Sequence, residues 1–155
     1  MKIKINLFFF SFLFFTPFMY SQTLIWAKGY GNNALGDESS ASVAVDAAGN
    51  VYTTGYFWGT MDFDPGAGTF NLTSAGNSDI FVQKLDASGN FVWAGRIGGL
   101  ADENGNAIAL DASGNIYITG MISTMADMDP GTSTVNAITS SGSYDAFVEK
   151  LSGSG

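Results

Sequence analysis

The sequence predicts an all-β protein built from two copies of one four-stranded antiparallel unit. Motif blocks recur in the same order about 66 residues apart. Within each copy, bulky and small side chains alternate with the period of two that a half-buried strand shows. No stretch sustains the spacing of apolar residues that an amphipathic helix needs. We therefore expect strands joined by short turns throughout both copies.

The first 21 residues have the pattern of a secretory signal peptide. Lys2 and Lys4 precede an apolar stretch from Leu7 to Tyr20. As a helix, these roughly fourteen residues would span about 21 Å, which is short of the roughly 30 Å hydrocarbon core of a bilayer. Ser21 suits the position before cleavage, and no cysteine follows that a lipid could modify. We predict a protein that is secreted or held at the outer cell surface, with no membrane insertion after cleavage.

The mature chain, from residue 22 onward, is strongly acidic. It keeps all 14 acidic residues of the sequence, whereas two of the 6 basic residues leave with the signal peptide. The remaining basic residues are scattered along the chain: Lys28, Lys84, Arg96 and Lys150. Because nucleic acids and anionic membranes are bound by clustered positive charge, we exclude nucleic acid as a partner.

The composition also limits the chemistry, because the chain contains no histidine and no cysteine. Ser-His-Asp and Cys-His nucleophile systems, disulfides, and metal sites of thiolate or imidazole are excluded. A two-carboxylate glycosidase is a weak hypothesis, because nearly every Asp falls at a repeated turn position, whereas catalytic residues break repeat symmetry. The exceptions are the clusters at 37–38 and 102–103, which are themselves roughly equivalent. We expect a protein that is not an enzyme and has no cofactor, with calcium as the alternative.

Four blocks of sequence define the repeat. The longest carries an Asp-x-x-Gly-Asn turn between two alternating segments, and the others carry an Asp-x-Asp-Pro-Gly turn, an Asp-x-Phe-Val-x-Lys-Leu strand and a Trp-Ala strand. In the two copies they occupy 42–52 and 107–117, 62–66 and 127–131, 79–85 and 145–151, and 24–27 and 91–94.

Each copy is predicted to contain two hairpins. In the first copy, the strand with Val43 and Val45 pairs with the strand bearing Val51 and Thr53 through the turn 46–50. The segment 80–85 then pairs with 91–94 through the turn 86–90. In both turns, Asp offers a side-chain oxygen to the backbone, and Gly supplies the positive φ that the hairpin needs before the chain returns.

The alternation gives each sheet one bulky face and one face of small side chains. Bulky positions alternate with small ones in the first strand of each copy: Val43, Val45, Ile108 and Leu110 lie between Ser42, Ala44, Ala107 and Ala109. Small residues allow close approach of a second sheet, and a sheet that is apolar on both faces has to pack against copies of itself. The sequence therefore predicts stacked repeats.

The run Asp-x-x-Gly-Asn-x-Tyr-x-Thr-Gly is present over 111–120 and, with Thr53, over 46–55. Followed by Asp-x-Phe-Val-x-Lys-Leu and then Trp-Ala, it resembles the bacterial β-propeller repeat of secreted proteins, often assigned to seven-bladed propellers, over nearly all of residues 23–151. The resemblance implies propeller blades in a secreted or surface protein of gliding, type IX-secreting bacteria, where such repeats often precede a C-terminal sorting domain. It implies no defined chemistry, and we expect no sorting domain after Gly155.

Two blades do not close a ring, because propellers have about four to eight. We divide the chain into a signal peptide (1–21), a first repeat preceded by the orphan strand 24–27 (22–90), and a second repeat that stops before its last strand (91–155). The orphan strand is available to complete the second blade. Three arrangements remain open: a fragment of a longer chain, a two-blade protomer in a ring of copies, and an open two-blade monomer.

The candidate metal ligands are two pairs of aspartates, each followed by Pro-Gly: Asp62 and Asp64, and Asp127 and Asp129. Alternating carboxylates resemble the start of a calcium loop. However, the third ligand and the closing Glu are missing, and recurrence in both copies favours a structural turn in which the Asp side chain accepts backbone N–H groups.

The candidate ligand-binding residues are Trp26, Trp58 and Trp93, because an exposed indole can stack on a sugar ring. Trp26 and Trp93 occupy equivalent positions, which favours packing between blades. Trp58 has no aromatic counterpart in the second copy and is the better candidate for an exposed aromatic.

These observations predict a non-enzymatic propeller-repeat protein that acts as an interaction or adhesion scaffold outside the cell. Its expected partners are other blades, from the rest of a longer chain or from symmetric copies, and an extracellular protein or glycan. The alternative is a carbohydrate-binding lectin whose two-blade protomers assemble into a ring.

Overall fold

The computed structural model describes residues 21–31, 37–131 and 137–154, so the predicted signal peptide lies outside it except for Ser21. The described residues form strands and contain no helix, and therefore none long and apolar enough to cross a membrane. The all-β prediction is confirmed. The strands are β1 (Glu38–Val45), β2 (Val51–Asp62), β3 (Asn71–Leu85), β4 (Phe91–Gly99), β5 (Asn104–Leu110), β6 (Ile116–Ile122), β7 (Met125–Asp127), β8 (Ala137–Thr139) and β9 (Asp145–Leu151).

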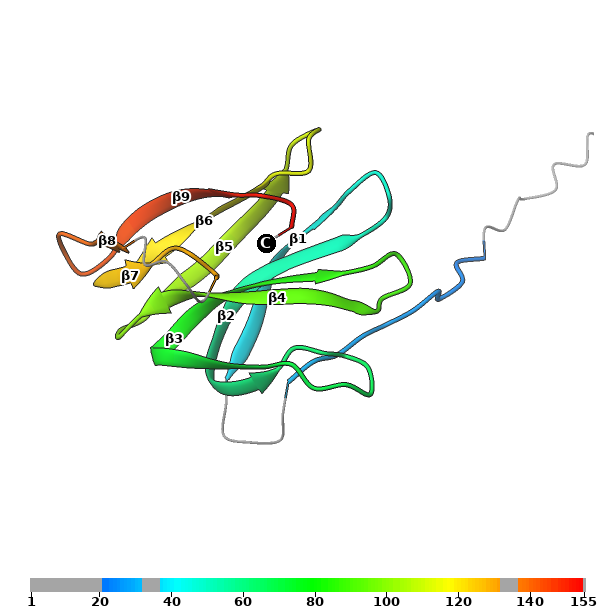
Figure 1. The fold of residues 1–155 in the computed structure, drawn as a ribbon, viewed down its shortest axis with the longest axis horizontal. Helices are drawn as coiled ribbons and strands as arrows, with labels where there is room; N and C mark the ends of the chain where they lie inside the picture. The colour runs from blue at the N-terminus through cyan, green and yellow to red at the C-terminus, as the bar shows by residue number, and fades with distance from the viewer. Residues whose placement is uncertain (1–20, 32–36, 132–136, 155) are drawn as a thin grey trace, which may run out of the picture.

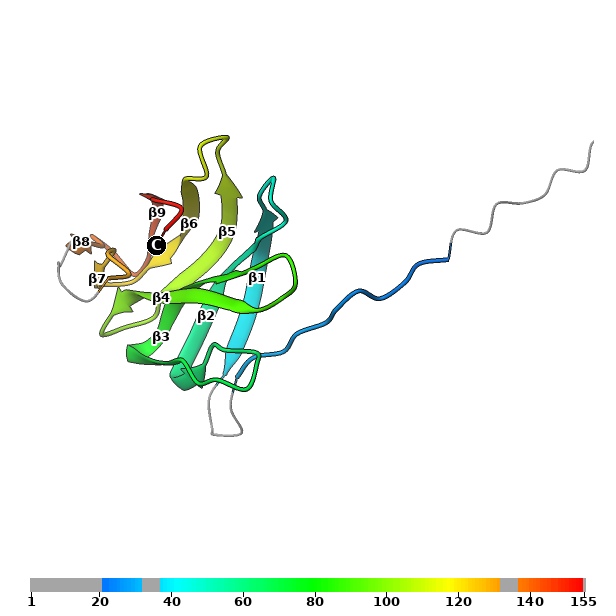
Figure 2. The ribbon, with the colours of Figure 1, turned by 45° about the vertical axis from the view of Figure 1, so that its right-hand side comes forward.

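The strands form two antiparallel sheets that are stacked face to face (Figures 1 and 2). The first has the order β1-β2-β3-β4-β7-β8, and the second has the order β5-β6-β9. Strands β1 to β4 form a four-stranded blade, of which β4 lies beyond residue 90, the end of the first repeat in the division made from the sequence. Strands β5, β6 and β9 of the second copy form a three-stranded blade.

Both predicted hairpins are present in the first blade. Val43 lies opposite Thr53 in the β1–β2 pair, and Lys84 lies opposite Trp93 in the β3–β4 pair. In the first turn, the Asp46 Oδ1 atom accepts hydrogen bonds from the N–H groups of Ala48 and Asn50, each at 2.9 Å. The glycines of the three Asp-x-x-Gly-Asn turns all have positive φ: 85° at Gly49, 78° at Gly89 and 81° at Gly114. The turn chemistry predicted from the sequence therefore sets both hairpins.

The glycine that ends each long motif faces a β-bulge. The register shifts between Ser40 and Ser42 opposite Gly55, and between Gly105 and Ala107 opposite Gly120. A Cβ atom at Gly55 would overlap the carbonyl oxygen of Ser39. A glycine is therefore needed here by close approach of the neighbouring backbone.

We call the side of a blade that bears the bulky β1 or β5 residues its front face, and the opposite side its back face. The back face of the first blade packs against the front face of the second, which confirms the predicted stacking (Figure 2). Tyr52, Ile80 and Val82 from the first blade meet Ile108 and its neighbours from the second in this core. The other buried members are Ile97, Ile116, Ile118, Ile122, Ala126, Met128 and Phe147.

A second, smaller core lies on the front face of the first blade. Phe57, Met61, Phe63 and Phe81 are fully buried there, and the Phe63 and Phe81 ring centroids are 5.1 Å apart. Tyr30 covers this cluster, with its ring stacked on Phe63 at 5.8 Å. At the β1 end of the same face, however, Val43 and Val45 are each 60% exposed.

The second copy departs from the first beyond β6. The counterparts of the distal ends of β2 and β3 become the separate strands β7 and β8. Strand β7 pairs with the end of β4, with Gly98 opposite Asp127 and Gly99 opposite Ala126. The first sheet thereby reaches six strands and ties the two copies together through backbone hydrogen bonds.

Residues 21–31 form no strand within the chain. They run along the first blade, where the Gly31 N–H donates to the Asp62 carbonyl oxygen at 3.0 Å, and then lead away from the body (Figure 1). The orphan segment 24–27 therefore does not complete the second blade of its own chain. Among the described residues, β9 pairs only with β6.

At Gly105 the two blades lie too close together to accommodate a side chain. A Cβ atom at Gly105 would lie 2.5 Å from Thr54 Oγ1 and 2.8 Å from Ile80 Cγ2. We expect Gly105→Ala to lower the free energy of unfolding by about 1–3 kcal/mol, because the sheets must separate to admit the methyl group. Urea denaturation measures this. Gly142→Ala is the control, since its Cβ would meet nothing within 4 Å; equal stability of the two variants would contradict the packing.

Candidate functional site

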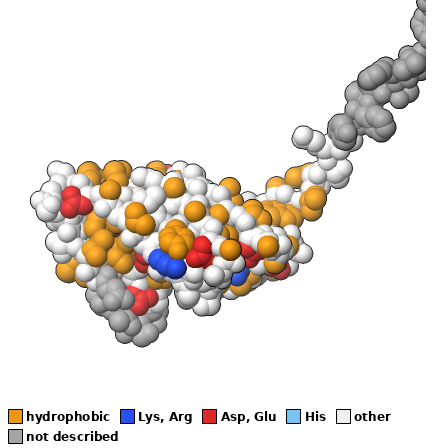
Figure 3. Space-filling model, turned by 90° about the horizontal axis from the view of Figure 1, so that it is seen from above, with side chains coloured by type: hydrophobic (Ala, Val, Ile, Leu, Met, Phe, Trp, Pro, Cys, Tyr) orange, Lys and Arg blue, Asp and Glu red, His pale blue; other side chains and the backbone are white. Residues whose placement is uncertain are grey.

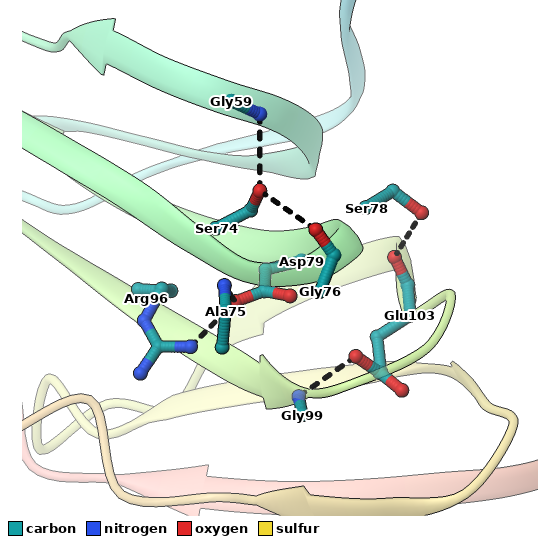
Figure 4. Close-up of polar contacts among 9 residues, drawn as sticks. All are labelled: Gly59, Ser74, Ala75, Gly76, Ser78, Asp79, Arg96, Gly99 and Glu103. Carbon is teal, nitrogen blue, oxygen red and sulfur yellow. Dashed lines mark hydrogen bonds and ion pairs between the residues drawn. The ribbon is translucent and has the colours of Figure 1, made fainter.

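A set of charged groups lies where the two blades join (Figure 4). Asp79 at the middle of β3 is fully buried, and its Oδ2 atom accepts a hydrogen bond from Arg96 Nη1 at 2.6 Å. The same oxygen accepts the Ala75 N–H at 2.9 Å, whereas Oδ1 has no hydrogen-bond partner. Arg96 lies on β4, so this ion pair joins neighbouring strands of the first blade.

Glu103, just before β5, brings the second copy to the same place. Its N–H donates to the Ser78 carbonyl oxygen at 2.8 Å, and its Oε2 atom accepts the Gly99 N–H at 2.8 Å. The Glu103 side chain is fully buried, and burial, with the charges of Asp79 and Asp102, raises the pKa of its carboxyl group. Asp102 accepts a hydrogen bond from Ser78 Oγ at 3.2 Å.

This acidic centre fastens β3, β4 and the start of β5 together. Asp79 and Glu103 have no exposed surface, so neither carboxyl group can touch a substrate while the blades stay packed. The sequence singled out the 102–103 cluster as an exception to the turn positions, but it indicated neither the burial of Glu103 nor the ion pair of Arg96. The available signal was that Asp79 recurs as Asp145, and that Arg96 is one of few basic residues in the mature chain.

The aspartates proposed as metal ligands lie in two equivalent turns. Asp62 Oδ1 accepts the N–H groups of Asp64 at 3.0 Å and Phe70 at 2.8 Å, and Asp64 Oδ1 accepts the Gly66 N–H at 2.7 Å. In the second copy, Asp127 Oδ1 accepts the Asp129 N–H at 3.1 Å, and Asp129 Oδ1 accepts the Gly131 N–H at 2.8 Å. These contacts are the ones expected if the aspartates form structural turns. Within the described residues, no group of three or more acidic side chains is placed to hold a metal ion; calcium binding stays a prediction.

The Asp-x-x-Gly-Asn turns show the same use of carboxylates. Asp111 accepts hydrogen bonds from the side chain and the N–H of Asn115, at 2.7 and 2.9 Å, and these bonds lower its pKa to about 2. Hydrogen bonds from Asn50 and Asn90 likewise lower the pKa values of Asp46 and Asp86. These carboxylates are held ionised by their own loops, so they are poorly suited to proton transfer near neutral pH.

The three tryptophans do not form one site. Trp58 is opposite Ser78 and Trp93 is opposite Lys84, so they lie toward opposite ends of the β3 segment Ser78–Lys84. Trp58 is 50% exposed, whereas Trp93 packs against the core between the blades. The Trp26 indole N–H donates to the Ala87 carbonyl oxygen at 3.2 Å. Of the three, Trp58 has the exposed ring that a stacking ligand needs.

One buried polar position differs between the copies. Gln83 is fully buried in the first blade, and its Nε2 donates to the Phe63 carbonyl oxygen at 2.6 Å. Glu149 is its counterpart in the second blade, and its Oε2 atom is buried with no hydrogen-bond partner. Burial, followed by the charges of Asp129 and Asp127, raises the pKa of Glu149 to about 7. A carboxyl group therefore titrates near neutral pH where the first copy has a neutral amide.

The back face of the second blade offers an apolar surface for contact with another molecule. A shallow hollow of about 220 Å³ lies there between β5, β6 and β9. Val148 on β9 is 79% exposed at its edge. The remaining lining residues are Ala107, Ile108, Ala109, Tyr117, Ile118 and Thr119. Figure 3 shows apolar side chains spread over one side of the molecule among few charged ones.

Comparison with known proteins gives one distant similarity. No protein-family model and no solved structure matches the chain. Among curated proteins, the chain is similar to a WD repeat-containing protein of Acanthamoeba polyphaga mimivirus, itself uncharacterized, with 27% identity over 88 residues. The match covers 48% of this chain and 6% of that protein. WD repeats form four-stranded propeller blades. With the stacked antiparallel sheets, the similarity supports propeller-type repeats, and the described residues show no closed propeller.

The Glu149 carboxyl predicts a pH-dependent difference in stability. Because its pKa in the folded chain is about 7 and its ordinary value is 4.5, the folded state loses stability as this group ionises from about pH 4.5 to pH 7. We expect Glu149→Gln to raise the free energy of unfolding at pH 8 by about 1–3 kcal/mol, allowing for solvent screening, and to have little effect at pH 4.

Urea unfolding at both pH values measures this difference. The control is Asp37→Asn, which removes the same charge from an exposed position. A gain that is equal at pH 4 and pH 8, or that Asp37→Asn reproduces, would rule out the titration of Glu149 as its cause.

Proposed function

We propose that this chain is an exported, non-enzymatic scaffold of the bacterial β-propeller repeat type, which works outside the cell by binding a protein through its blades. The similarity to a WD repeat-containing protein and the stacked four-stranded unit support the repeat part of this proposal. The signal-peptide pattern of residues 1–21 supports export.

The observation that carries the binding role is the pair of outer blade faces. The stack has a front face at one end, with Val43 and Val45 each 60% exposed, and a back face at the other, with Val148 79% exposed. Exposed apolar side chains on a sheet face are costly in water unless a partner covers them. The buried and turn carboxylates, by contrast, are engaged in holding the fold, which supports a role without catalysis.

Site-specific crosslinking tests the scaffold role. Benzoylphenylalanine at position 148 is expected to crosslink the exported chain to a protein on irradiation of intact cells of the encoding organism. Position 92 is the control, because Val92 is 47% exposed at the bulge of β4 rather than on an outer blade face. If position 148 yields no crosslinked protein, or if the chain stays in the cytoplasm with its signal peptide attached, the proposal is wrong.

A lectin is the second candidate function, and the exposure of Trp58 favours it. Its indole is 50% exposed with no aromatic counterpart in the second copy, so it is available to stack on a sugar ring. On a glycan array, we expect the mature chain to bind a carbohydrate class and Trp58→Ala to lose that binding. Val92→Ala is the matched control. An array without signal, or binding that survives Trp58→Ala, removes Trp58 as a sugar-binding residue.

A further inference from the structure

The contact between the two blades shows how this repeat recognises a copy of itself. Five residues of the first blade form the part of its back face on which the second blade packs, and we call this surface the floor: Ser42, Ala44, Tyr52, Thr54 and Val82. Ile108 of the second blade packs in the core formed there, and its N–H donates to Ser42 Oγ at 3.3 Å. Ile108 is only 7% exposed as a result. The interface is thus a front face set on a back face.

The two outer faces of the stack are the counterparts of the two faces in that interface. The floor on the back of the second blade consists of Ala107, Ala109, Tyr117, Thr119 and Val148, which lines the hollow described above. Its residues are exposed or half-buried, although the same positions in the first blade are half-buried or buried. On the front of the first blade, Val43 and Val45 occupy the positions of Ile108 and Leu110. The two outer faces therefore carry, position for position, the residues that form the interface between the blades.

Strand β9 adds a second open feature at the same end. In the first blade, the outer edge of β3 is covered by β4, with Gln83 opposite Ala94 and Lys84 opposite Trp93. The equivalent edge of β9 has no partner strand among the described residues, so Glu149 and Lys150 have no strand beside them on that side. A sheet edge of this kind accepts a strand from another chain.

The N-terminal segment 24–31 already lies where a β4 from a preceding blade would lie. The Gly31 N–H donates to the carbonyl oxygen of Asp62. The equivalent residues of the next repeat, Gly98 on β4 and Asp127 on β7, also lie opposite each other. The fit extends inward, since Tyr30 contacts Phe63 and Phe81, and its counterpart Ile97 belongs to the core that contains Met128 and Phe147. The outer part of the segment remains uncovered, with Leu24 79% and Ile25 88% exposed.

We infer that copies of this chain assemble head to tail, with the front face of one copy seated on the back face of the next. In this arrangement residues 24–30 of the first copy add to the open edge of β9 in the second. Transferred from the β3–β4 pair, the register places Trp26 opposite Lys150 and Ala27 opposite Glu149. The added segment gives the second blade its fourth strand, and the front face of the neighbouring copy covers Val148.

A second copy is the occupant favoured by the residues on both sides. The same chain carries both halves of an interface whose geometry is already realised between its own blades. Its own segment 24–31 lies on the first blade, so it does not cover β9 of its own chain. The contact is heterologous, which means that two different surfaces meet and that successive copies continue in one direction or close into a ring.

This inference rests on the proposed scaffold function and identifies a second copy of the chain as the protein it binds. Two variants, one on each outer face, test it. Val43→Arg blocks the front face and Val148→Arg blocks the back face, and both side chains are exposed enough for the single blades to fold. By light scattering after size-exclusion chromatography at micromolar concentration, we expect the mature chain to be oligomeric and each variant to be monomeric. An equal mixture of the two variants is expected to form a dimer of twice the protomer mass, since one intact front face meets one intact back face.

Val92→Arg is the matched control, and it should keep the oligomer of the unaltered chain. A monomeric unaltered chain, a variant that remains oligomeric while folded by circular dichroism, or a mixture that stays monomeric would overturn the inference. Those results leave the scaffold proposal separately testable, because crosslinking from position 148 to a different protein would persist without self-assembly.

Discussion

The close approach of the two sheets is the constraint on which the rest of the structure depends. Because the side chains of Ser42 and Ala44 are small and Gly105 has none, the two sheets approach closely enough for Ile108 to contact the back face of the first blade. Everything at the joint follows from this separation. It brings Glu103 within reach of Gly99, buries Asp79 beside Arg96, and places β7 against the end of β4. The polar contacts at the joint thus lie beside the apolar packing, and one oxygen each of Asp79 and Glu103 is buried there without a hydrogen-bond partner.

The hairpins and the stacking could be predicted because each depends on residues close together in the sequence. An Asp and a Gly at fixed positions determine each turn, and alternation at Val43, Val45, Ile108 and Leu110 determines which faces are bulky. The pairing of β7 with β4 was not predictable, because it depends on the relative position of two stacked sheets. The ion pair of Arg96 was also missed, since a single arginine without a counterpart carries no repeat signal. Likewise, the repeat identified 24–27 as a final strand but could not tell on which blade that segment lies.

Among the candidate site residues, the sequence was most informative where it recurred. The contacts of Asp62 and Asp64, repeated by Asp127 and Asp129, are those of backbone turns. Trp93 packs against the core between the blades, as its repeated position predicted, whereas Trp26 lies against a turn of the first blade. Trp58, which has no aromatic counterpart in the second copy, is the most exposed of the three. The substitution of Glu149 for Gln83 was visible in the sequence. Its meaning required the burial of that position, which periodicity alone does not give.

The front-to-back order of the blades has a consequence for how such a chain can change in length. A tandem duplication of the gene segment that encodes one repeat inserts a unit whose upper and lower surfaces both match their new neighbours. The repeat that followed the insertion point now packs on the inserted repeat, which presents the same surface as its former neighbour, so no compensating substitutions are required. A fold organised in this way is expected to vary in repeat number among related genes more readily than in the sequence of its blades, because adding a unit preserves every interface while altering one residue at the floor disturbs it.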